Sequence, residues 1–144
     1  MKDEFTTVFL DVVKETQVRT GYELPHELEA YVVMLLSYFV DKPNYLPEAS
    51  FAEAYLRLQK RNGLNAKQLG DTCLFVCGVF PTYGSRYGLN KNYYNKIGIS
   101  SYELVAEAWH NNLFDLLAIH FDFLSNFIDV AIHSSNSERY NLFR

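Results

Sequence analysis

The sequence predicts an all-α fold, arranged as a single compact bundle of about six or seven helices. Apolar residues recur at intervals of three and four along most of the chain, the period of a helix with one buried side. No stretch of useful length alternates apolar and polar residues as a half-buried strand does. The chain has 144 residues, of which 49% are hydrophobic and 16% aromatic, so it can bury one sizeable core. We therefore expect one helical domain over residues 1–134 and a C-terminal tail over 135–144.

Three helices are expected in the first half of the chain. The first carries an apolar stripe near its start and should end at Gly21. The second begins near Pro25, which suits a first helical turn. Its later half is apolar almost all round, so we expect it to be a central helix. The third is predicted from about Pro47 to Arg61, with a stop at Asn62-Gly63.

The stretch from Leu69 to Gly98 is the least polar part of the chain. It carries no charge from Thr72 to Ser85 and holds five of the seven glycines. A helix in its first half should end at Phe80-Pro81, because proline lacks the amide hydrogen that continues a helix. An irregular loop should follow, in which Gly84 and Gly88 can adopt positive φ.

Four small residues of that helix indicate tight packing. Cys73 and Cys77 lie one helical turn apart, and we interpret them as reduced core residues rather than as part of a disulfide framework. Glycine in a helix interior costs roughly 0.5–1 kcal/mol relative to alanine. Gly70 and Gly78 therefore suggest that neighbouring elements pass close by.

Further helices are expected after the loop. Asn90 can cap a short helix that ends at Gly98. Ser100 and Glu103 match a capping box for the next helix. The longest helix is predicted over residues 113 to about 133.

Composition bears on the class of partner and on the compartment. A net charge of −4 gives no general attraction to nucleic acid or anionic lipid, which select basic proteins. The longest apolar runs fall far short of the ~20 residues that a membrane-spanning helix needs. The first residues lack the basic and apolar regions of a secretion signal. We therefore expect a cytoplasmic protein that binds neither nucleic acid nor membrane.

Two features could support chemistry at a metal or another cofactor. Glu107 and His110 form a Glu-x-x-His motif like those of di-iron bundles, which use two such motifs. Asp129 and His133 could form a second half-site, but they look solvent-facing. His120 falls in the middle of the apolar face of the last helix, where it could act as an acid, a base or a haem ligand. We favour a satisfied core histidine and a protein with no cofactor. The alternative is a small metal- or cofactor-binding enzyme.

Residues 81–94 concentrate the residue types that dominate protein–protein contacts. The candidate binding residues are Tyr83, Arg86, Tyr87, Tyr93 and Tyr94. They favour a non-catalytic binding or regulatory module. The competing interpretation is that these tyrosines form a roof over the core, which they cover without binding a partner. The partner would be another protein or a second copy of the chain, because the second helix has surplus apolar surface that a homodimer could cover.

Asp71 lies near the start of a helix that is otherwise free of charge. A carboxylate buried alone is costly unless it is paired or hydrogen-bonded. We expect an ion pair between Asp71 and Arg86 across the turn at Pro81. Simple stabilisation by the helix dipole is the alternative.

A spaced set of residues in the middle of the chain resembles a family of uncharacterised bacterial all-helical proteins. The set comprises Gly70-Asp71, Leu74-Phe75, Gly78, Phe80-Pro81, Gly88, Tyr93-Tyr94, Gly98 and Tyr102. The resemblance covers about a quarter of the chain. It implies a bacterial, helical protein and carries no activity, cofactor or catalytic residue with it.

Overall fold

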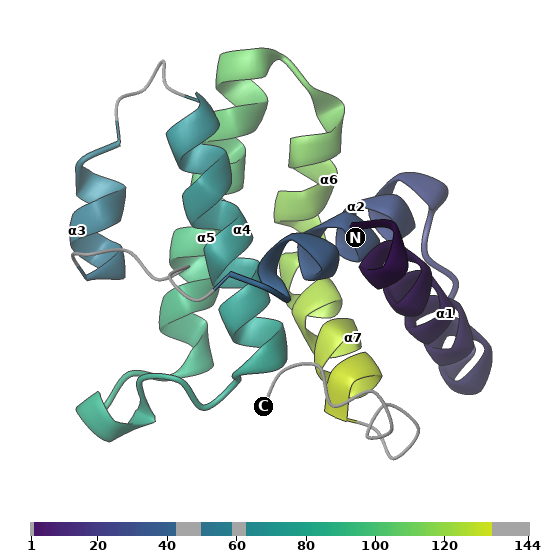
Figure 1. Cartoon of the computed structure of the whole chain (residues 1–144). Helices are drawn as coiled ribbons and strands as arrows, with labels where there is room; N and C mark the ends of the chain where they lie inside the picture. Colours follow the sequence, from purple (N-terminus) through teal and green to yellow (C-terminus); the bar gives the residue numbers. More distant parts are fainter. Residues whose placement is uncertain (1, 43–49, 59–62, 134–144) are drawn as a thin grey trace.

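The computed structural model describes residues 2–42, 50–58 and 63–133, and it is all-α over these residues (Figure 1). The helices are α1 (Lys2–Thr20), α2 (His26–Phe39), α3 (Phe51–Leu56), α4 (Gly63–Val79), α5 (Lys91–Trp109), α6 (Asn112–Ile119) and α7 (Phe121–His133). A 3₁₀ turn, η1 (Ser85–Tyr87), lies between α4 and α5. No strand occurs in the described ranges, so the predicted fold class is confirmed. The predicted tail at 135–144 lies outside the described residues.

Helix α4 forms the centre of the bundle. Every residue from Leu69 to Val79 is buried, and the helix contacts α2, α3, α5 and α7. Figure 1 shows α5 running alongside α4 in the middle of the molecule, with α3 on one side and α1 on the other. The prediction that the second helix would be central is wrong. One side of α2 packs on the core, but Met34 is 61% exposed and Tyr38 is also exposed, so α2 is a covering helix.

Glycines bring α5 and α7 close to α4, as predicted for Gly70 and Gly78. A Cβ at Gly70 would lie 2.8 Å from the ring of Tyr102 on α5. A Cβ at Gly78 would lie 2.5 Å from Ile128 on α7. Both distances are shorter than real Cβ contacts, so these helices could not approach α4 as closely if either position carried a side chain.

Two predicted helix boundaries in the second half of the chain are wrong. Helix α5 continues through Gly98, which serves packing instead of ending a helix, since a Cβ there would lie 2.3 Å from Phe121. The helix predicted over 113–133 is divided at His120 into α6 and α7. This break leaves His120 exposed and lets Phe121, which is fully buried, enter the core.

Three local signals set helix ends where the sequence predicts them. Gly21 follows α1 with a φ of 77°, and Pro81 lies just beyond the end of α4. The side-chain oxygen of Asn90 accepts a hydrogen bond from the amide of Tyr93 at 3.3 Å and so caps α5. The third predicted helix, over 47–61, ends earlier than the predicted stop at Asn62-Gly63, because α3 ends at Leu56 and Gly63 begins α4; residues 47–49 and 59–61 lie outside the described part.

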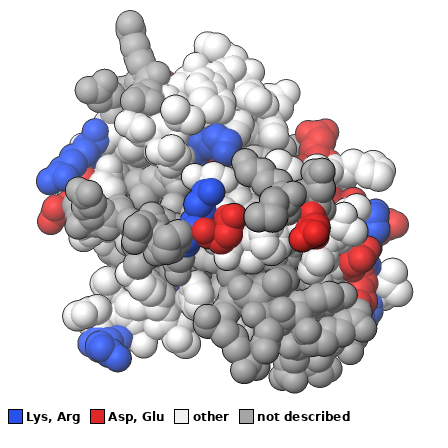
Figure 2. Space-filling view, in the orientation of Figure 1, with Lys and Arg blue, Asp and Glu red and all other residues white. Residues whose placement is uncertain are grey.

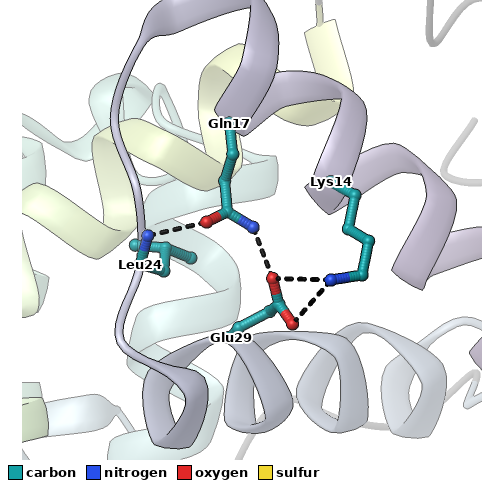
Figure 3. Close-up of polar contacts among 4 residues, drawn as sticks. All are labelled: Lys14, Gln17, Leu24 and Glu29. Carbon is teal, nitrogen blue, oxygen red and sulfur yellow. Dashed lines mark hydrogen bonds and ion pairs between the residues drawn. The ribbon is translucent and has the colours of Figure 1, made fainter.

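A polar cluster joins α1 to α2 (Figure 3). Gln17 donates a hydrogen bond to Glu29 over 2.5 Å and accepts one from the amide of Leu24 over 2.7 Å. The Nζ of Lys14 lies 3.3 Å and 3.4 Å from the two carboxylate oxygens of Glu29. The hydrogen bond from Gln17 and the ammonium of Lys14 together outweigh partial burial and lower the pKa of Glu29. The cluster ties the end of α1 to the first turns of α2.

The described helices differ from membrane-spanning ones, because none of them combines the necessary length with the necessary hydropathy. In Figure 2, basic and acidic side chains are interspersed among the coloured residues of the face in view, and neither sign forms a broad patch there.

Candidate functional site

The segment between α4 and α5 carries the predicted binding residues and projects from the bundle at the lower left of Figure 1. Gly84 and Gly88 flank η1 with φ of 84° and 75°, a left-handed conformation that favours glycine. The amides of Tyr87 and Leu89 both donate to the carbonyl of Gly84, over 2.9 Å and 3.1 Å. These bonds close the segment on itself, so it presents a defined turn.

The structure divides the five predicted residues into two groups. Tyr94 belongs to the core, with 3% of its surface exposed, and Tyr93 is half-buried. Tyr83 packs edge-on against Tyr94, with ring centroids 5.5 Å apart. Arg86 is exposed, and Tyr87 is 79% exposed. The roof interpretation therefore describes Tyr93 and Tyr94, whereas Arg86 and Tyr87 are displayed to solvent.

The buried group forms the base on which the turn rests. Phe51 of α3 contacts Tyr94 at a centroid distance of 5.0 Å, and the hydroxyl of Tyr93 accepts a hydrogen bond from the amide of Ala52 at 3.2 Å. Burial raises the pKa of Tyr94 to about 12, so this ring stays neutral. A Cβ at Gly84 would clash with the Tyr94 hydroxyl, which places the turn directly against the hydroxyl end of that side chain.

A cleft of about 600 Å³ lies between the turn, the start of α3 and the start of α5. Its lining residues are Ser50, Phe51, Thr82, Tyr83, Gly84, Ser85, Arg86, Tyr87, Leu89, Tyr93 and Tyr94. All five predicted binding residues border this space. It therefore has an aromatic floor and an exposed arginine and tyrosine on its rim.

The predicted ion pair between Asp71 and Arg86 is wrong. Asp71 lies at the middle of α4, and its carboxylate meets the ammonium of Lys67, one turn earlier on the same helix, at 2.7 Å. Its other oxygen accepts hydrogen bonds from the hydroxyls of Tyr31 at 2.5 Å and Tyr102 at 2.6 Å. Arg86 lies on η1, beyond the C-terminal end of α4, whereas the partners of Asp71 are Lys67, Tyr31 and Tyr102. The buried charge is still compensated, as the sequence argument required, but by other partners.

The two tyrosines act as donors to this carboxylate. Burial, and then the negative charge of Asp71, raises the pKa values of Tyr31 and Tyr102. Both hydroxyls therefore keep their protons. The cluster joins α2, α4 and α5 through one carboxylate.

A second cleft, of about 520 Å³, lies between α2 and α4 beside this cluster. It is lined by Tyr31, Met34, Leu35, Tyr38, Phe39, Lys42, Leu64, Lys67, Gln68, Asp71 and Thr72. Sequence reasoning missed it. The spacing of Met34 and Tyr38, one turn apart on α2, was the available signal, but nothing local could place α4 opposite them.

The histidine candidates do not form a site. His110 ends α5 in a left-handed conformation with a φ of 50°, so Glu107 and His110 do not share a helix face, and both are exposed. The prediction that His120 lies on a buried apolar face is wrong, because the helix breaks there. His133 lies 3.8 Å from Asp129, and its ring meets the carbonyl of Val79 at 2.8 Å. Within the described ranges, no group of three His, Cys, Asp or Glu residues is placed to hold a metal ion.

The cysteines match their predicted role in the core. Cys73 and Cys77 are buried and are not joined in a disulfide. Burial raises the pKa of the Cys77 thiol to about 12 and raises that of Cys73 as well. Both side chains act as small apolar residues of α4.

Comparison with known proteins assigns no relative: no family model, no curated protein and no solved structure gives a significant match to the chain.

Proposed function

We propose that this protein is a non-catalytic binding module of the cytoplasm, and that it recognises a protein partner through Arg86 and Tyr87 on the turn between α4 and α5. The observation that carries the proposal is the exposure of Tyr87, 79%, on a turn whose base is buried and hydrogen-bonded. A large ring held in solvent by an ordered backbone contributes little to the core. It is available for contact with another molecule.

The turn combines features that favour tight contact. Tyrosine and arginine are the side chains most often found to dominate binding energy at interfaces. The hydrogen bonds to Gly84 and the contact with Tyr94 hold the backbone before any partner arrives. Less conformational entropy is then lost on binding than for a loop that must first become ordered.

The five candidate residues have different parts in this proposal. Arg86 and Tyr87 make the contact, and Tyr83 borders it at the edge of the cleft. Tyr93 and Tyr94 support the turn from below. Substitutions in the first group should affect partner binding, whereas substitutions in the second group should affect stability.

The test compares alanine variants of Arg86 and Tyr87 with matched controls elsewhere. Arg19 and Tyr22 are also exposed, and they lie near the junction of α1 and α2. Each tagged variant is used to capture partners from the native cell, and its thermal stability is measured in parallel. The proposal expects R86A and Y87A to lose a partner that wild type, R19A and Y22A retain, with melting temperatures unchanged. Equal recovery by all five proteins would refute it.

Self-association remains a prediction for the same protein. Met34 and Tyr38 are exposed on α2, the helix whose apolar surface suggested a homodimer. Light scattering over a range of protein concentrations distinguishes a monomer from a homodimer. A mass that stays at the chain's 16.7 kDa would exclude the dimer.

A further inference from the structure

The cleft between α2 and α4 has the dimensions and walls of a small-molecule site. Its volume of about 520 Å³ falls within the range of roughly 300–1,000 Å³ that is typical of ligand pockets. Met34, Leu35 and Phe39 form the α2 wall, and Leu64 faces them from α4. Met34 and Leu64 are more than half exposed although both are large apolar residues. The cleft therefore offers apolar surface that remains exposed in the described part of the chain.

Two lysines stand at different ends of this apolar surface. The Nζ of Lys67 lies 5.5 Å from the ring centroid of Tyr31, and the Nζ of Lys42 lies 4.9 Å from that of Tyr38. Tyr31 and Tyr38 are seven residues apart on α2, which is about 10 Å at 1.5 Å per residue, so the two lysines lie beside different parts of the α2 wall.

The two lysines differ in how fully their charges are compensated. Lys67 lies 2.7 Å from the carboxylate of Asp71, which is also part of the cleft wall. Lys42 lies 3.8 Å from Asp41, and the two side chains are 39% and 58% exposed, so this pair is weak. An anion at the Lys67 end would meet Asp71. An anion at the Lys42 end would meet a cation that is only weakly paired.

We propose that the α2–α4 cleft binds a small apolar monocarboxylate, with its carboxylate beside Lys42 and its hydrocarbon chain along Met34 and Leu35 toward Leu64. The charge arrangement selects one anionic group at one end, since Asp71 disfavours a second at the other end. The apolar wall between Tyr31 and Phe39 is about 12 Å long at the helical rise, which suits an acyl chain of medium length. This inference goes beyond the proposed function and does not depend on the turn at Tyr87.

An acidic amphipathic helix from another protein would be the competing occupant, because helix grooves also bind such segments. The cleft volume of about 520 Å³ is that of a small-molecule pocket, so it favours the smaller ligand. A peptide that binds the cleft when the monocarboxylate does not would overturn the proposal.

The test uses purified protein, titrated calorimetrically with decanoate and separately with 1-decanol. The alcohol has the same chain and no charge. Decanoate should bind saturably with one site per chain, about five- to tenfold more tightly than the alcohol, because a partly exposed charge pair contributes modestly. K42M should remove this difference, whereas K96M, a variant of an exposed lysine on α5, should retain it. Equal binding of acid and alcohol by wild type, or an unchanged difference in K42M, would refute the proposal.

A second pair of variants locates the hydrocarbon chain. M34E places a carboxylate on the cleft wall and should abolish decanoate binding, whereas V18E, a variant of the exposed Val18 on α1, should not. Circular dichroism and urea unfolding verify that both variants fold. Undiminished binding by folded M34E would show that decanoate binds elsewhere and would overturn the assignment. Y87A should bind decanoate as wild type does. The decanoate site and the partner-binding turn are therefore tested separately, and either assignment can fail without the other.

Discussion

Replacing Tyr102 by phenylalanine removes a single hydroxyl from a buried polar contact. Tyr102 has 0% of its surface exposed, and its hydroxyl donates to Asp71 over 2.6 Å. The ring would keep its packing against Gly70 and Phe114. The substitution therefore tests the hydrogen bond with little change in shape.

The magnitude follows from the charge of the acceptor. Hydrogen bonds to charged groups contribute about 1.5–3 kcal/mol, and Asp71 would keep Tyr31 and Lys67 as partners. We expect Y102F to lower the free energy of unfolding by about 2 kcal/mol. The corresponding change at Tyr31, which is only partly buried, should cost about 1 kcal/mol.

Urea unfolding followed by circular dichroism measures this loss, with Y38F as the matched control. Tyr38 lies on the exposed side of α2, so removing its hydroxyl should change stability by less than about 0.5 kcal/mol. A double-mutant cycle with D71N should give a coupling of at least about 0.5 kcal/mol. Losses for Y102F that match Y38F, or that add to those of D71N without coupling, would refute the role assigned to Asp71.

Three further predictions follow from other contacts. The pKa of Glu29 is lowered in the folded state, so its stabilising contribution is complete above the ordinary value of 4.5 and is lost as the pH falls through the folded pKa. E29Q should therefore lose less stability in acid than wild type or E27Q. Equal losses of stability with falling pH for all three proteins would contradict this. Burial raises the pKa of Cys77 to about 12, so a thiol reagent at pH 8 should label the protein only as fast as the protein unfolds. Immediate labelling of the folded protein would be inconsistent with a buried thiol. G98A should lower stability by about 1–2 kcal/mol, because overpacking against Phe121 outweighs the gain of about 1 kcal/mol in helix propensity; a more stable G98A would show that this packing is loose.

Local chemistry was enough to predict the fold class and several helix ends. The glycine after α1, the proline after α4 and the cap at Asn90 each act within a few residues, so the sequence alone reveals them. His120 shows where this reasoning fails. A helical wheel assumes an unbroken helix, and the break between α6 and α7 changes the face on which His120 lies.

The partners of Asp71 could not be predicted, because they come from distant positions. Sequence reasoning recognised that this charge needed compensation, yet Tyr31 and Tyr102 reach it only after α2 and α5 have packed on α4. The predicted binding segment has the same limit. Residue type marked four tyrosines and one arginine as candidates, but only the packed structure distinguishes the buried Tyr94 from the exposed Tyr87.

The affinity of the captured partner for Y87A tests the central claim most directly. Calorimetry with that partner should give a dissociation constant roughly thirtyfold weaker for Y87A than for wild type, which is the loss of about 2 kcal/mol expected of a hot-spot residue. The melting temperature of Y87A should stay at the wild-type value, because the ring is 79% exposed. Equal dissociation constants for the two proteins, or a weaker one that is accompanied by an equivalent loss of folded protein, would contradict the assignment of Tyr87 as a binding residue.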